Sequence, residues 1–281
     1  MSTIHPEDPH SGSEKNALGT DAEAPLDRQT LADIVDLALS TGQLLIENGA
    51  ESRRVEETIR TLGNGLGCDW GDVSVSYDAI IVSHSSGGEF RTKIRHVNRR
   101  GVNMTLITAI SHLTHRVADG RFDRIMVRTE LRHIRNMPRL YNRWQTILTV
   151  GLACAAFSRL FGGDWRVFIV TLFAASGAMF VRQELVRRNF NPLLVVSITA
   201  FVAGLLVGIF HFLQLVGQPG VALAASVLLL VPGVPFINAV EDLIKGHVVV
   251  GIAQAVTGAL IILAIAMGLI LAMQVTGIKG L

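Results

Sequence analysis

Residues 230–247 read LVPGVPFINAVEDLIKGH, and this stretch decides how the second half of the chain folds. Pro232 and Pro235 interrupt a long apolar run there. Each proline lacks a backbone donor and clashes with the carbonyl four residues back, so an intact helix cannot pass through them. In a lipid bilayer, carbonyls freed in this way are tolerated only against protein or a water-filled cavity. The stretch therefore predicts a broken transmembrane helix, a device with which many transporters build a substrate site.

The composition places this stretch in a membrane protein. Of the 281 residues, 49% are hydrophobic and only 17% are charged, whereas about 25% are charged in a typical soluble domain. Charged residues crowd the region before Trp144 and become sparse after Arg188. We therefore expect a membrane α-helical bundle, residues 144–281, preceded by a small cytoplasmic α+β domain, residues 29–143. The net charge of +2 gives no indication of a nucleic-acid partner.

The sequence predicts neither a leader nor a cofactor. Residues 1–28 are polar and acidic, without the apolar segment of a signal peptide, and are expected to form a disordered tail. Cys68 and Cys154 fall in different halves, so no disulfide framework is expected. The histidines lack the companions of a zinc site, and Gly87-Gly88 lacks the lysine of a phosphate loop. No metal, cofactor or catalytic constellation is predicted.

Periodicity divides the soluble half into elements. Apolar residues at helical spacing predict a helix over 30–48 and a second helix from Ser52. Alternation over 73–97 around Gly87-Gly88 predicts a β-hairpin. Asn103 is a candidate N-cap for a third helix, which Gly120 would close. A basic helix is expected from Arg124 to Arg143.

The membrane half is expected to contain about five spans. They cover about 145–161, 165–181, 192–216, 219–240 and 247–275. Crossing the hydrocarbon core takes about 20 apolar residues, a length that the first two spans barely reach. The alternative for these two is a re-entrant hairpin, which would leave three crossings.

The distribution of arginine and lysine predicts the orientation. They gather before the first span, between spans two and three, and between spans four and five, at positions that share one side of the membrane. Because cytoplasmic loops carry an excess of these residues, we expect an inner-membrane protein with a cytoplasmic N-terminal domain and an external C-terminus.

Three groups of residues are candidates for function or for packing. The first shapes a substrate path with a polar cytoplasmic mouth: Pro232, Gly233, Pro235, Asn238, Glu241 and Asp242. Its alternative is a kinked helix whose two acidic residues lie solvated in a loop. The second is the charged run Glu51, Ser52, Arg53, Arg54, Glu56 and Glu57, which by composition resembles a solvated, salt-bridged helix face. The third consists of small residues at four-residue spacing that favour close helix packing: Ala200, Gly204, Gly208, Gly251 and Ala255.

Several segments resemble the threonine/serine exporter family, in its N-terminal half. Residues 48–58 read NGAESRRVEET, residues 99–103 read RRGVN, and residues 230–247 read as quoted above. Each is similar to a signature of that family, and the three occur in the family's order. The resemblance extends over about residues 30–275.

The resemblance implies a cytoplasmic domain followed by about five spans, and export of small polar metabolites. These are threonine and serine in some members, and C4-dicarboxylates such as succinate in others. Full-length members carry a second membrane half that this chain lacks, so the resemblance implies a larger subunit acting with a second small membrane subunit. A homo-oligomer is also compatible with the sequence. The resemblance draws attention to the run from Glu51 to Glu57 without assigning it a role.

Two other classes of function remain open from the sequence. The charged run from Glu51 to Glu57 is compatible with a hydrolase-like enzyme anchored by the membrane half. The soluble domain is also compatible with a sensory subunit that gates a partner transporter. The exporter is the preferred hypothesis, driven by proton coupling or by the substrate gradient, because the sequence shows no ATP-binding motif.

Overall fold

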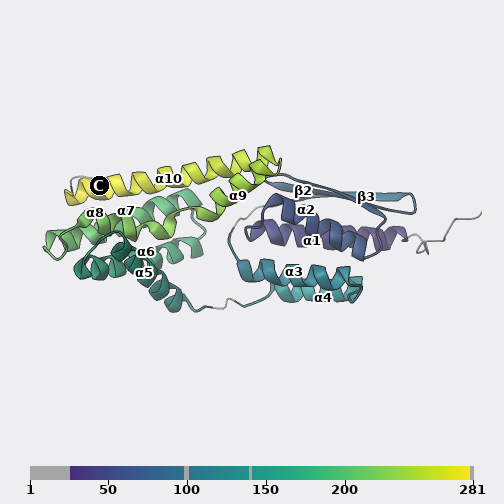
Figure 1. Cartoon of the computed structure of the whole chain (residues 1–281), viewed down its shortest axis with the longest axis horizontal. Coiled ribbons are helices and arrows are strands. Elements are labelled where there is room, and N and C mark those ends of the chain that lie inside the picture. Colours follow the sequence, from purple (N-terminus) through teal and green to yellow (C-terminus); the bar gives the residue numbers. More distant parts are fainter. Residues whose placement is uncertain (1–25, 98–100, 139–140, 279–281) are drawn as a thin grey trace, which may run out of the picture.

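A computed structural model of the chain describes residues 26–97, 101–138 and 141–278. An N-terminal α+β region with a three-stranded sheet is followed by a region made of helices, and the two lie end to end (Figure 1). This order confirms the predicted sequence of an α+β region and a helical region. The tail predicted over 1–28 falls, up to residue 25, outside the described residues.

The N-terminal region has three layers. One layer is an antiparallel sheet of β1 (Trp70–Val75), β2 (Ala79–Ser86) and β3 (Glu89–His96), in that order. The middle layer holds α1 (Arg28–Glu47) and α2 (Ser52–Gly65), and the outer layer holds α3 (Met104–Ala118) and α4 (Arg124–Arg135). Ile80 and Val82 of β2 are buried and alternate with more exposed residues, so this part of the sheet presents an apolar face to the middle layer.

Two details of this region differ from the sequence-based expectation. The chain turns between Val75 and Ala79, where the amide of Ser76 donates to the Ala79 carbonyl at 2.8 Å, so the expected hairpin is a three-stranded meander. The alternation of apolar residues continues across this turn and therefore hides it. The expected basic helix is also too long, because α4 ends at Arg135.

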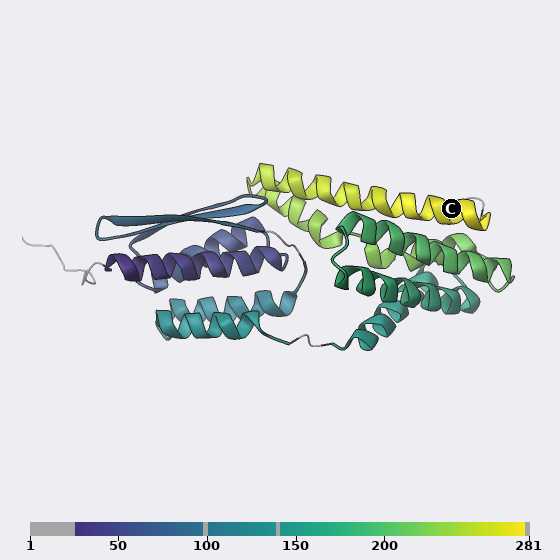
Figure 2. The same ribbon diagram turned by 180° about the vertical axis from the view of Figure 1, so that it is seen from behind.

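The helical region contains four long helices and one broken segment. The long helices are α5 (Arg143–Leu160), α6 (Trp165–Arg187), α7 (Pro192–Phe212) and α10 (Val248–Thr276). The broken segment consists of α8 (Pro219–Ser226), a single 3-10 turn η1 (Leu228–Leu230) and α9 (Gly233–Ile244). Figure 2 shows from behind that α10 runs along the outside of this region and that α9 and the start of α10 reach the N-terminal region.

The expected number of five spans is wrong. Within the described residues, α6, α7 and α10 are long and apolar enough to cross a membrane, and the bent α8–α9 segment makes a fourth if it counts as one span. The helix α5 is long enough but does not qualify, because polar residues such as Arg143, Gln145 and Arg159 lower its mean hydropathy too far. Instead of the short span expected over 165–181, α6 extends for 23 residues.

Small residues bring α7 and α10 into close contact. On α7, Gly204 faces Ala272 and Gly208 faces Thr276, while Ala200 lies against Gly268 of α10. A methyl group added to any of these glycines would overlap its neighbour, and such close approach is how helices associate in lipid.

The small residues of α10 near its start face a different helix. Gly251 lies against the Ala239 carbonyl and Leu243 of α9. Ala255 is only half-buried, and the buried positions that follow Gly251 are Gln254 and Gly258. The face of α10 that packs against α9 therefore includes Gly251 but not Ala255, and so it differs from the stripe of small residues expected from the sequence.

Candidate functional site

The helix break lies where the two prolines predict it. Pro232 is the N-cap of α9, Pro235 lies in its first turn, and the axes of the segments before and after the break differ by 61°. The first four amides of a helix have no partner within the helix, so Pro235 removes no helical hydrogen bond there. The Leu228 carbonyl accepts from the Val231 amide at 3.2 Å, and the Val231 carbonyl accepts from the Gly233 amide at 2.9 Å. Local turns thus satisfy both carbonyls.

The polar residues of α9 point at the N-terminal region. Asn238 donates from Nδ2 to the Gly49 carbonyl oxygen at 2.9 Å. Asp242, one helical turn further on, is fully buried and accepts from both the amide and the hydroxyl of Ser52, at 3.0 and 3.1 Å. Residues four apart share one helix face, and this face of α9 joins the broken segment to the start of α2.

The Asp242 carboxylate takes the place of a missing cap on α2. Glu51 is the N-cap residue of that helix, but its side chain makes no capping hydrogen bond. The free amides and the positive end of the helix dipole favour an anion at this position, which Asp242 supplies from another helix. Gln254 of α10 donates to the same carboxylate at 2.8 Å. The carboxylate therefore links α2, α9 and α10.

A second ionic contact flanks the first. Lys245 donates from Nζ to the two Glu51 carboxylate oxygens at 2.7 and 2.6 Å and to Glu241 Oε1 at 2.6 Å. His247 Nε2 lies 3.7 Å from Glu56 Oε2. All five of these groups border the same junction, so α2 meets the membrane region through ionisable groups of both kinds, acidic and basic.

Burial at the junction raises the pKa of two carboxyl groups. Desolvation raises the pKa of Glu51, while its hydrogen bond to Lys245 opposes the rise. Desolvation likewise raises the pKa of Glu56, while the nearby His247 opposes it. Because burial disfavours the charged form, both groups take up a proton more readily when the N-terminal region is docked than when it is free.

Glycines allow the backbone to pass closely at this junction. Gly49 has a φ of +93°, a conformation that other residues rarely adopt, and a side chain at this position would press against the Gly101 carbonyl. The amide of Gly101 donates to the Glu47 carbonyl at 2.8 Å, and that of Asn103 to the Asn48 carbonyl at 3.0 Å. The segment 101–103 thus packs beside residues 47–49. Arg99 and Arg100, the first two residues of that motif, lie outside the described residues.

The charged run of α2 divides into two faces. Glu51, Ser52 and Glu56 face the membrane region, as described above. Arg53 and Glu57 form an exposed ion pair at 2.7 Å, with side chains 57% and 61% exposed, and Arg54 is also exposed. The prediction of a solvated, salt-bridged helix face therefore applies only to Arg53, Arg54 and Glu57.

Gln254 and Thr257 stand out in the sequence as polar residues of an apolar span, a position that favours interhelical hydrogen bonding. Gln254 holds Asp242, and Tyr77, in the turn between β1 and β2, forms a hydrogen bond of 3.0 Å with Thr257 of α10. The contact of Gln254 with Asp242 agrees with that expectation, whereas the contact of Tyr77 with Thr257 joins positions 180 apart in the chain and follows no motif. Lys245 was visible only as a positive charge that helps to predict topology.

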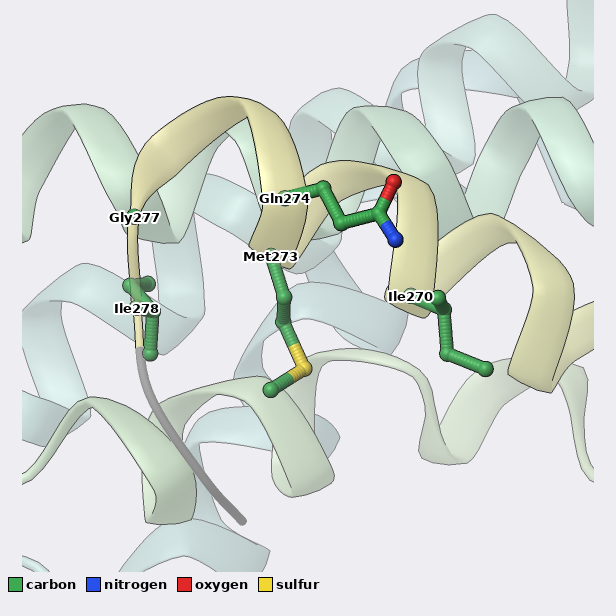
Figure 3. Close-up of a pocket in the computed structure, with 5 residues that line it drawn as sticks. All are labelled: Ile270, Met273, Gln274, Gly277 and Ile278. Atoms are coloured by element: carbon green, nitrogen blue, oxygen red, sulfur yellow. The ribbon is translucent and has the colours of Figure 1, made fainter.

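A shallow hollow lies at the other end of α10 (Figure 3). It has a volume of about 360 Å³ and is lined by Ile270, Met273, Gln274, Gly277 and Ile278. None of these five described residues carries a charge, so they offer no partner for a charged metabolite.

A membrane-spanning helical region with a broken helix, held by a buried carboxylate to a separate α+β region, defines a membrane transport protein. The chain belongs to the family described as "Putative threonine/serine exporter", whose family model matches residues 36–276. No solved structure matches this chain.

Curated relatives fall into two groups by length. The chain is 37% identical to "Probable succinate transporter subunit YjjP" of Klebsiella aerogenes over 259 residues, which cover 90% of this chain and 98% of that protein. It is 36% identical to the protein of the same name in Escherichia coli K12, over 88% of this chain and 96% of that protein. It is 20% identical to "Threonine/serine exporter" of Corynebacterium glutamicum, over 81% of this chain but only 48% of that protein. These relatives are transporters rather than enzymes, so the hydrolase-like alternative is set aside.

Proposed function

We propose that the chain is the larger subunit of an inner-membrane exporter for small carboxylate-bearing metabolites. The substrates are threonine and serine or C4-dicarboxylates such as succinate, in line with the names of the relatives. The observation that carries the proposal is the buried Asp242, which ties the broken helix to α2. In this arrangement any movement of the N-terminal region is transmitted directly to α9.

Basic residues at the helix ends support a cytoplasmic N-terminal region. The ends nearest that region carry Arg143, Arg187, Arg188 and Lys245. The opposite ends of α5 and α6 carry Arg159 and Arg166. Because the cytoplasmic side has the excess of positive charge, the N-terminal region is cytoplasmic, and the C-terminal end of α10 lies on the external side.

A second small membrane subunit completes the exporter. Two relatives that this chain covers almost fully are named as subunits. The threonine/serine exporter of Corynebacterium glutamicum has about as much sequence again beyond the part matched here. A separate membrane chain equivalent to that remaining part explains why some relatives are about as long as this chain and others about twice as long. Protons or the substrate gradient drive the export, since no ATP-binding motif occurs in the sequence.

The contacts of Glu51, Ser52 and Glu56 with α9 and α10 favour a second candidate function. In that case the chain gates a pore formed by its partner and contributes no substrate contact. It predicts that the partner alone exports substrate and that this chain changes only the rate or its regulation.

Efflux from cells that lack their native exporters tests the proposal. The cells are preloaded with a threonine-containing dipeptide or with succinate, and they express this chain with and without its small membrane partner. Efflux that requires both chains supports a two-subunit exporter and gives its substrate class. Asn238→Ala and Asp242→Asn are expected to reduce this efflux, whereas Arg53→Ala, in the exposed ion pair, leaves it unchanged. Undiminished efflux from well-expressed Asn238→Ala and Asp242→Asn proteins refutes the role given to α9.

A further inference from the structure

A groove in the membrane region lies beside the helix break. It has a volume of about 270 Å³ and is formed by α5, α6 and η1. From α5 come Ala153, Cys154 and Phe157, and η1 contributes Leu228 and Leu229. The turn that interrupts the broken segment therefore forms one wall of a space large enough for a small metabolite.

Arg182 of α6 is the one charged residue among the described residues that line this groove. It makes no hydrogen bond or ion pair with any part of the chain that the structure describes. Its neighbours differ: Arg143 binds Gln183 and Glu184, and Arg188 binds Glu184. An ionisable side chain within a membrane-spanning helix is costly and marks a functional site. A guanidinium stays charged in such surroundings and offers a fork of donors that matches a carboxylate.

We propose that Arg182 binds a carboxylate of the transported metabolite in this groove. The inference rests on the proposed function and adds a binding residue to it. One guanidinium matches one carboxylate, the group that threonine, serine and C4-dicarboxylates share. The apolar walls from α5 and η1 contact the carbon skeleton, and η1 is connected through Val231 and Pro232 to α9, whose Asp242 binds Ser52. Substrate binding at Arg182 is thereby linked to the junction with the N-terminal region.

A lipid phosphate has the same charge as a carboxylate, so the test separates the two. The full chain, with Cys68→Ser and Cys154→Ser, carries Ala153→Cys as a reporter thiol in the groove and is placed in phosphatidylcholine nanodiscs. The rate at which a small methanethiosulfonate reagent modifies this thiol is measured against succinate and against threonine. Arg182→Gln and Arg182→Lys are compared with Arg187→Gln, which removes an exposed charge from the same helix.

The expected result is saturable protection of the thiol by succinate or threonine. Arg182→Gln weakens the apparent affinity about ten- to a hundredfold, as expected for hydrogen bonds to a charged group. Arg182→Lys keeps the charge but loses the fork, so it weakens affinity less, while Arg187→Gln changes it less than twofold.

Three results overturn the proposal. The first is the absence of protection by either compound, and the second is protection that persists in Arg182→Gln. The third is seen without added metabolite: the thiol is modified more slowly when phosphatidylglycerol replaces part of the phosphatidylcholine, and this slowing requires Arg182. Such a result assigns the groove to a lipid headgroup. Because the assay measures binding without transport, it is independent of the efflux test. If Arg182→Gln retains wild-type efflux while Asp242→Asn loses it, the groove is rejected and the exporter stands.

Discussion

Replacing Asp242 with alanine should release the N-terminal region from the membrane region. The carboxylate accepts three hydrogen bonds, two of them from Ser52 across the junction and one from Gln254. Each hydrogen bond to a charged group contributes about 1.5–3 kcal/mol, and the three share one acceptor and are not additive. Alanine leaves the neutral donors of Ser52 and Gln254 without an acceptor, which costs about 1–3 kcal/mol. The docked state should therefore weaken about ten- to a hundredfold.

Hydrogen exchange of the full chain in nanodiscs, followed by mass spectrometry, measures this effect directly. The Ser52 amide donates to Asp242, so a peptide covering residues 48–58 reports the opening of the junction. Asp242→Ala should make it exchange faster by the factor given above. Ser52→Ala removes one of the three bonds and should cost about 1 kcal/mol. Arg53→Ala should have no effect, because exposed ion pairs contribute little.

A peptide covering residues 79–96, in the sheet, is the internal control. It should keep its protection in every variant, because its hydrogen bonds lie within the N-terminal region. The reasoning is refuted if residues 48–58 exchange at the wild-type rate in Asp242→Ala while the control peptide is intact.

Three further predictions concern packing, charge and pH. Gly268→Val should separate α10 from the Ser197 carbonyl of α7 and destabilise the protein by about 1–3 kcal/mol, and an unchanged melting temperature in detergent would contradict it. Glu51→Lys and Lys245→Glu should each weaken docking and together restore it; a double variant no better than either single one would count against their contact. Because burial raises the pKa of Glu51 and Glu56, the docked state binds more protons and docking should weaken as pH rises above 4.5. Energy transfer between labels on the two regions measures the docked fraction, and a fraction that increases with pH would disprove the sign.

The sequence predicted the features that depend on local chemistry. The helix break at Pro232 and the cap of α3 by Asn103 follow from backbone donors and caps, and a reader of the sequence can place them. The turn after Val75 was missed because its flanking residues keep the alternation of a strand. The fourth span was expected to end at residue 240, which left Asp242 outside it, whereas α9 continues to Ile244.

The junction itself could not be read from the sequence. Asp242 and Ser52 are 190 positions apart, and no spacing rule relates them. Periodicity within α2 identified the pair of Arg53 and Glu57 at four-residue spacing. It could not indicate that Glu51, on another face of the same helix, meets a lysine near the C-terminus. Such contacts depend on the packing of two regions, which local propensities do not encode.

Transport by purified components tests the central claim most directly. The chain and its small membrane partner are reconstituted into liposomes loaded with unlabelled succinate or threonine, and uptake of the labelled compound by exchange is measured. We predict exchange that needs both chains and that falls at least tenfold with Asp242→Ala. Absence of exchange of either compound, or equal exchange by the Asp242→Ala protein, would contradict the account.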